Sequence, residues 1–255
     1  MTTDSETSAG TQDSGSPGRG GSAPVRKLDG IAVAGIVLAI VVAMTVPADK
    51  LQGDVQRLMY VHVPSAWVAF LAFGVTAISS VAWLRTRKMG WDTTAAASAF
   101  VGVFFTGTAL ASGMIWGKPT WGVFWTWDAR LVSTALLFVI YLGYLALRRA
   151  TPDPIDRARR SAIVGVIAAF QVAVVYKSVD WWVTLHQQSS RDSIDPALRL
   201  SLWVSVLAFT IVYIGLTSRR KALLEAEEAL RLRGLRSSAV AGDAVSVPNL
   251  DLPDG

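Results

Sequence analysis

Apolar residues gather in six blocks of about 20 residues each, and short polar connections separate these blocks. An α-helix of about 20 residues is long enough to cross the hydrocarbon core of a bilayer. The blocks hold almost no charged side chains, which collect in the connections. We therefore predict an all-α polytopic membrane protein with six transmembrane helices, at residues 31–46, 61–84, 94–115, 131–147, 161–176 and 198–217.

The two ends of the chain differ from these blocks. Residues 1–28 are rich in Gly, Ser, Thr and Asp, a composition that predicts a disordered tail. Residues 221–237 are rich in Ala, Leu, Glu and Arg, which favours a helix ahead of a disordered end. The expected organisation is a tail over 1–28, a membrane domain over 29–218 and a second tail over 219–255.

Lysine and arginine concentrate in alternate connections. Three basic residues follow the second block, and five arginines lie between the fourth block and the fifth. Basic residues mark the cytoplasmic side of a bacterial plasma membrane. The pattern predicts that both termini are cytoplasmic and that segments 47–60, 116–130 and 177–197 are external. It also accounts for the net charge of +5, so nucleic acid is not an expected partner.

The chain contains no cysteine and only two histidines, His62 and His186. The missing cysteines exclude thiolate nucleophiles, iron–sulfur ligation and cysteine-based zinc sites. Both histidines fall at external ends of the predicted helices. Each alone is typical of an interfacial hydrogen bond, but together they fit an axial pair for a haem iron. A zinc site with Asp128 as third ligand is an alternative that the spacing does not favour.

Six of the ten tryptophans lie in two of the external segments. The richer segment is 116–131, between the third and fourth helices, with Trp116, Trp121, Trp125, Trp127, Asp128 and Arg130. If residues 121–128 are helical, Trp121, Trp125 and Asp128 share one face, and Trp182 and His186 are spaced likewise. Such a surface suits a flat apolar ligand with a charged edge, whereas an aromatic belt is the alternative.

Three motifs carry a resemblance to a known family. They are W-G-V-F-W-T-W-D at 121–128, Y-V-H-V-P-S-A-W around His62, and S-V-D-W-W-V-T-L-H-Q around His186, with S-I-D-P-A after it. In this order they resemble the tryptophan-rich haem-handling proteins of cytochrome c biogenesis, and most closely the cytochrome c maturation protein C, or haem exporter protein C, family. The resemblance covers residues 30–217.

The resemblance implies that the external segment holds haem b, with His62 and His186 as axial ligands. Trp116, Trp121, Trp125, Trp127, Asp128 and Arg130 carry over as the haem platform. Beyond the resemblance, we expect Arg130, with Lys118 or Arg57, to meet the propionates and Asp128 to orient a partner, and a pair between Arg130 and Asp128 is the alternative. The implied role is haem export and delivery to the periplasmic haem chaperone, cytochrome c maturation protein E. ABC transporter subunits and a small single-helix protein are the other implied partners, and no catalytic residue is expected.

Two further interpretations are open. A small-molecule transporter would use the tryptophans as a belt, but it predicts polar groups within the helices, where only Gln171 is notable. A membrane scaffold would bind partners without needing haem.

Overall fold

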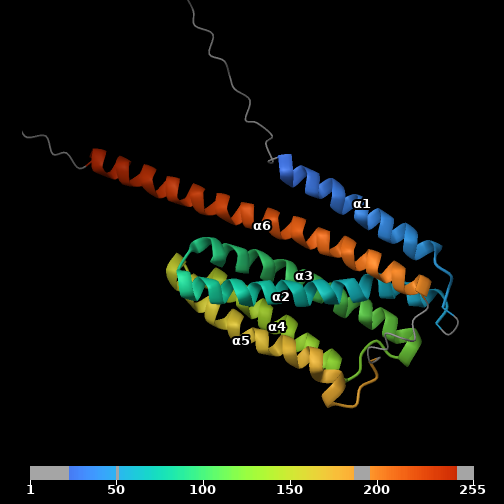
Figure 1. Ribbon diagram of the computed structural model, residues 1–255. Helices are drawn as coiled ribbons and strands as arrows, with labels where there is room; N and C mark the ends of the chain where they lie inside the picture. Colours follow the sequence, from blue (N-terminus) through green and yellow to red (C-terminus); the bar gives the residue numbers. More distant parts are fainter. Residues whose placement is uncertain (1–22, 50–51, 187–195, 246–255) are drawn as a thin grey trace, which may run out of the picture.

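The computed structural model describes residues 23–49, 52–186 and 196–245, and its regular structure in these ranges is helical (Figure 1). A single isolated β-bridge joins Asp49 to Gly53. The predicted all-α class is confirmed. The elements are α1 (Ala23–Thr45), a 3-10 helix η1 (Asp54–Leu58), α2 (Met59–Thr86), α3 (Met89–Trp121), α4 (Ala129–Ala150), α5 (Pro154–Trp181) and α6 (Pro196–Val245).

Local sequence explains where the central helices begin and end. Helix α3 stops at Gly122, whose φ of 79° is left-handed and whose N–H donates to the carbonyl of Lys118. Helix α4 begins after Asp128, a side-chain N-cap. Helix α5 begins after Asp153, another N-cap, with Pro154 in its first turn.

Helices α2 to α5 run up and down side by side, and α1 lies along α6 (Figure 1). The start of α1 lies about midway along α6, and the end of α6 extends past the bundle (Figure 1). We call the end of the bundle with the basic α2–α3 and α4–α5 connections the arginine end. The opposite end carries the 122–128 loop and both histidines, and we call it the histidine end.

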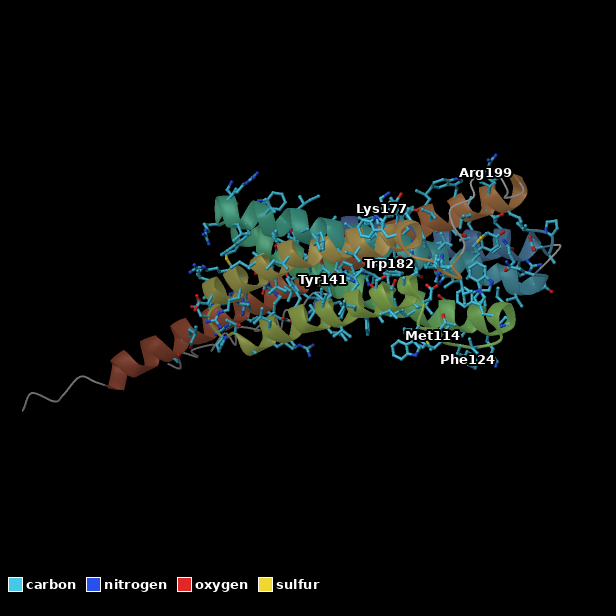
Figure 2. All side chains as sticks on the ribbon, turned by 90° about the horizontal axis from the view of Figure 1, so that it is seen from below. Met114, Phe124, Tyr141, Lys177, Trp182 and Arg199 are labelled. Carbon is cyan, nitrogen blue, oxygen red and sulfur yellow. The ribbon has the colours of Figure 1, made fainter. Side chains whose placement is uncertain are left out.

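Aromatic stacking and small residues hold the centre of the bundle together. The rings of Phe73 and Tyr141 stack with centroids 3.6 Å apart, and Tyr141 lies deep among the helices (Figure 2). Gly102 on α3 faces Phe73, and a Cβ there would come within 2.6 Å of that ring. Small residues at such crossings let membrane helices approach closely.

Large apolar side chains cover the outside of the helices. Phe104, Ile167, Phe170 and Trp203 are each more than 60% exposed, which a soluble protein would avoid over so wide an area. Five described helices are long and apolar enough to cross a membrane, and the apolar part of α1, Gly30–Thr45, is shorter. The chain is therefore a multi-pass membrane protein.

The terminal helices extend beyond the predicted blocks. Helix α1 begins at Ala23, ahead of the expected boundary at residue 29, so residues 23–28 are helical and not a disordered tail. Helix α6 continues without a break from Pro196 to Val245, so the helix predicted over 221–237 is confirmed and belongs to the same element as the sixth apolar block. Residues 1–22 and 246–255 lie outside the described ranges, and the division into three parts stays a prediction.

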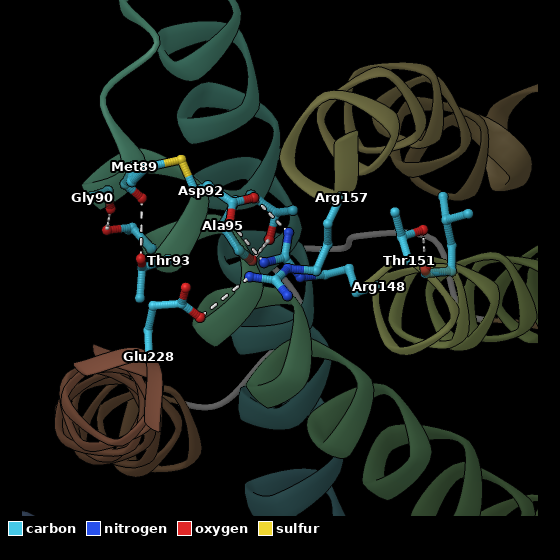
Figure 3. A network of polar contacts seen from close by, with 12 residues as sticks. Met89, Gly90, Asp92, Thr93, Ala95, Arg148, Thr151, Arg157 and Glu228 are labelled. Atoms are coloured by element: carbon cyan, nitrogen blue, oxygen red, sulfur yellow. Dashed lines mark hydrogen bonds and ion pairs between the residues drawn. The ribbon is translucent and has the colours of Figure 1, made fainter. Parts of the chain in front are cut away.

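A charged network connects the helices at the arginine end (Figure 3). The Arg148 guanidinium donates two hydrogen bonds to the Asp92 carboxylate, at 2.5 and 2.8 Å, and joins α4 to α3. Only 6% of the Asp92 side chain and 12% of the Arg148 side chain are exposed. Arg157 on α5 lies 3.8 Å from Glu228 on α6. The pairs fix the relative positions of these helices where the chain leaves the apolar zone.

Removing one member of the buried pair leaves the other charge without a partner. We expect Asp92→Ala to lower the free energy of unfolding by about 3 kcal/mol. The double variant Asp92→Ala/Arg148→Met should recover most of this loss, because no buried charge remains. Unfolding by detergent titration measures both. An Asp92→Ala variant as stable as the wild type would contradict the assignment.

Candidate functional site

His62 lies in the first turn of α2 and packs against α3. Its Nδ1 is 3.0 Å from the carbonyl oxygen of Ala109 and 3.3 Å from the hydroxyl of Ser112. A carbonyl can only accept, so the Ala109 contact places the proton on Nδ1. The lone pair is then on Nε2. Metal-binding histidines commonly have this arrangement, with the second nitrogen donating to a backbone carbonyl.

His186 lies in the segment that follows α5, and the structure brings it to His62. The two ring centroids are 6.4 Å apart, with 39° between the ring planes. A metal–imidazole bond is about 2 Å long, so two imidazoles on opposite sides of one ion have centroids roughly 6 Å apart. The observed separation therefore suits a single ion between the rings. No group of three or more metal-ligand side chains occurs in the described ranges, so the zinc alternative with Asp128 is not seen there.

Two glycines on α3 make room for this end of the site. A Cβ on Gly113 would lie 2.8 Å from Cε1 of His62, and one on Gly117 would lie 2.9 Å from the indole of Trp121. These distances are shorter than real Cβ contacts allow. The glycines are one helical turn apart, so the same face of α3 is open to the His62 and Trp121 rings. These two glycines were not predicted as site residues, although their G-x-x-x-G spacing is typical of close helix approach.

Trp116 also lies against the histidine pair. Its ring centroid is 5.8 Å from that of His62, at an interplanar angle of 74°. The indole N–H donates to Oε1 of Gln52 at 2.9 Å, and the ring packs with buried Met59 and Tyr60. Trp116 is thus the one member of the tryptophan-rich segment with a described ring contact to His62.

The remaining tryptophans do not share the helical face that their spacing predicted. Residues 122–128 are not helical, because Gly122 turns the chain out of α3, so the expected face of Trp121, Trp125 and Asp128 is wrong. The spacing of Trp182 and His186 fails equally, because α5 ends at Trp181. Instead, Trp125 and Trp127 pack edge to face at 6.0 Å, and Trp127 is 87% exposed.

Asp128 connects the tryptophan-rich segment to the segment that carries His186. Its Oδ1 accepts from the backbone N–H of Arg130 at 2.8 Å and caps α4. Its Oδ2 accepts from the backbone N–H of Leu185, also at 2.8 Å, one residue before His186. Burial raises the pKa of Asp128, but the hydrogen bonds from Thr184, Leu185 and the start of α4 outweigh burial and hold this pKa below its ordinary value. The carboxylate is thus ionised at neutral pH.

The three candidate cations differ in what they contact. Lys118 donates to the carbonyl of Gly122 at 2.8 Å, and Arg57 contacts Asp54 and the carbonyl of Ala43. Arg130 donates from Nη2 to the carbonyl of Tyr176 at 3.3 Å, whereas its buried Nε has no acceptor in the described part of the chain. Arg130 therefore keeps a donor for an anionic group.

The surface around Asp128 is apolar and open at the histidine end. A shallow pocket of about 290 Å³ is lined by Thr126, Trp127, Asp128, Val183, Thr184 and Leu185. Val183, Leu185 and Phe124 are all more than half exposed, and Phe124 lies at this end in Figure 2. Exposed apolar patches of this kind mark ligand or partner surfaces.

Comparison with known proteins gives the family. A family model described as heme exporter protein C matches residues 22–233. Heme exporter protein C of Bradyrhizobium diazoefficiens is 41% identical over 175 residues, which cover 67% of this chain and 66% of that protein. The protein of the same name from Escherichia coli strain K12 is 38% identical over 196 residues, covering 72% of this chain and 80% of that protein.

A plant relative is similar to this chain over a comparable length. A putative cytochrome c biosynthesis ccmC-like mitochondrial protein of Marchantia polymorpha is 37% identical over 182 residues, covering 71% of this chain and 76% of that protein. The range matched by the family model includes both histidines and the tryptophan-rich segment. This chain belongs to the heme exporter protein C family.

Proposed function

We propose that this protein binds haem b at the histidine end and presents it to a partner during haem export for cytochrome c biogenesis. The observation that carries the proposal is the pair of imidazoles, with centroids 6.4 Å apart, in a chain that has no other histidine. The names of the relatives, which refer to heme export and cytochrome c biosynthesis, support the same cargo.

In this proposal His62 and His186 are the axial ligands. The hydrogen bond from Nδ1 of His62 to Ala109 directs Nε2 to the iron and orients the ring before the ligand arrives. Haem bound in this way is cargo, and its iron needs no further protein chemistry. The protein therefore needs no catalytic residue, and its task is to bind, orient and release.

The other predicted residues of the site take three roles. Trp116, beside His62, covers part of the macrocycle, and Trp121, Trp125 and Trp127 supply further aromatic surface. Arg130, whose hydrogen-bond donors the described chain leaves partly unsatisfied, pairs with a propionate through its guanidinium. Asp128 holds the His186 segment in place through Leu185, a role that differs from the direct haem or partner contact expected from the sequence.

The charge distribution supports a topology for this arrangement. With the arginine end in the cytoplasm, both termini are cytoplasmic, and the histidine end lies on the external face of a bacterial inner membrane. Six spans then include α1, whose apolar part is short and packs along α6. The haem chaperone would dock on the exposed apolar surface around Trp127 and Val183. ABC transporter subunits and a small single-helix protein remain the expected membrane partners.

The transporter alternative gains no support from the described helices. Gln171 donates from Nε2 to the backbone carbonyl of Ser133 at 2.9 Å, which is a contact between α5 and α4. The scaffold alternative does not require haem. The test of the haem ligands below therefore separates it from our proposal.

Loss of either histidine should change the haem spectrum. We expect purified wild-type protein to show a Soret band of a low-spin haem, and His62→Ala or His186→Ala to weaken and shift it. Added imidazole should restore the band, because a free ligand can replace a deleted one. Trp91→Phe at the arginine end serves as the control. A double variant with an unchanged haem spectrum would rule out the ligand assignment.

Gly113→Ala should disturb His62 without removing it. The added methyl would overlap the imidazole at 2.8 Å, so the ring must move and its bond to Ala109 must weaken. We expect haem affinity to fall at least about tenfold, the usual effect of losing an outer-shell contact. Gly107→Ala is the matched control on the same helix, since its Cβ meets Phe138 at an ordinary 3.5 Å. Equal haem titrations for the two variants would contradict this seating of His62.

Asp128→Ala should release the segment before His186 and uncap α4. The lost cap costs about 1 kcal/mol, and the lost charge-assisted bond to Leu185 costs about 2 kcal/mol. Hydrogen exchange at residues 183–186 should accelerate. Since the native pKa of Asp128 is depressed, protection in the wild type should persist at neutral pH and be lost only as the pH falls through that lowered pKa, below the ordinary range of an aspartate. Protection that is the same in the variant would contradict this role.

A further inference from the structure

A groove runs along the outer surface between α3 and α4 at the arginine end. It encloses about 790 Å³ and is lined by Phe100, Val103, Phe104, Leu142, Leu145, Ala146, Arg149 and Ala150. All of these residues except Arg149 are apolar. The groove therefore has hydrocarbon-like walls and one charged end.

The apolar walls face the membrane. Phe104 is 61% exposed, Phe100 45% and Leu142 42%, and both helices are long and apolar enough to span a bilayer. Hydrocarbon is the natural filling for such a surface, so a single acyl chain suits the groove.

The charged end is formed by a cation that no carboxylate in the described ranges neutralises. Arg149 is exposed in the last turn of α4, and no described carboxylate forms an ion pair with it. Its neighbour Arg148 differs, because Arg148 turns inward and binds Asp92 with two hydrogen bonds (Figure 3). The adjacent arginines thus differ, since Arg148 pairs with a carboxylate of the described chain and Arg149 does not.

A second guanidinium lies beside the groove, over one of its lining residues. Arg220 of α6 stacks over the ring of Phe100, 5.0 Å from its centroid, and Phe100 lines the groove. The Nε of Arg220 is buried and has no acceptor in the described ranges. Its carboxylate neighbour, Glu227, is 3.9 Å away, near the limit for an ion pair. Glu227 is thus the described carboxylate paired with Arg220, and no described carboxylate pairs with Arg149.

We propose that this groove binds an anionic phospholipid, with an acyl chain between α3 and α4 and its phosphate at Arg149 and Arg220. Basic sites between transmembrane helices at the cytoplasmic side bind anionic lipid headgroups in this way. The two cations favour a lipid with net negative charge over a zwitterionic one. A partner helix would have to bring its own carboxylate to the same place. The proposal does not depend on haem, because the groove and the histidine pair are at opposite ends.

Native mass spectrometry of the full-length protein in detergent tests this site. With dioleoyl phosphatidylglycerol as the probe, we expect one preferred lipid adduct that dioleoyl phosphatidylcholine does not form at the same concentration. Arg149→Gln and Arg220→Gln should each weaken this adduct about fivefold. Arg159→Gln is the matched control, an exposed arginine on α5 at the same end, and should leave the adduct unchanged.

Two additional arms separate a lipid from other occupants. Ala146→Trp fills the groove and leaves both arginines in place, so it should abolish the adduct if the acyl chain lies there. Glycerol phosphate, which has the anion without the chains, should not compete. The proposal is overturned if Arg159→Gln weakens the adduct as much as Arg149→Gln. It is equally overturned if Ala146→Trp keeps the lipid but no longer copurifies with a membrane partner.

Discussion

The carboxylate of Asp128 holds together two segments that have little else in common. One oxygen caps α4 and so fixes where the tryptophan-rich loop ends. The other accepts from Leu185 and so fixes the chain just ahead of His186. Neither segment is helical there, so no regular backbone hydrogen bonds set their shape. The distance between His186 and His62 depends on this one ionised group, which the surrounding N–H donors keep charged.

The opposite side of the site is set by close helix packing. Helix α3 offers a carbonyl at Ala109 and an open face at Gly113, and His62 fits both. Trp116 closes the same corner and is itself tied to Gln52. A rigid histidine on a helix therefore faces a histidine on a loop. In the function that we propose, this difference allows haem to be held firmly on one side and released from the other.

Much of the fold was predictable because membrane helices follow simple rules of length and hydropathy. The helical class and the helix over 221–237 appear as predicted, and five of the apolar blocks lie in helices long enough to span a membrane. The loop geometry was not, because the i, i+4 spacing of Trp121 and Trp125 looks helical until the left-handed turn at Gly122 is known. Likewise, Asp128 was predicted as a site residue, but its bond to Leu185 joins residues 57 positions apart, and no local pattern shows this.

Electron paramagnetic resonance of the ferric, haem-loaded protein tests the central claim most directly, since it reports the ligands of the iron. Two imidazole ligands predict a low-spin signal in the wild type. Loss of His62 or His186 should convert it to a high-spin signal, and added imidazole should bring the low-spin signal back. A high-spin wild type, or a low-spin signal that survives in the His62→Ala/His186→Ala double variant, would contradict the account.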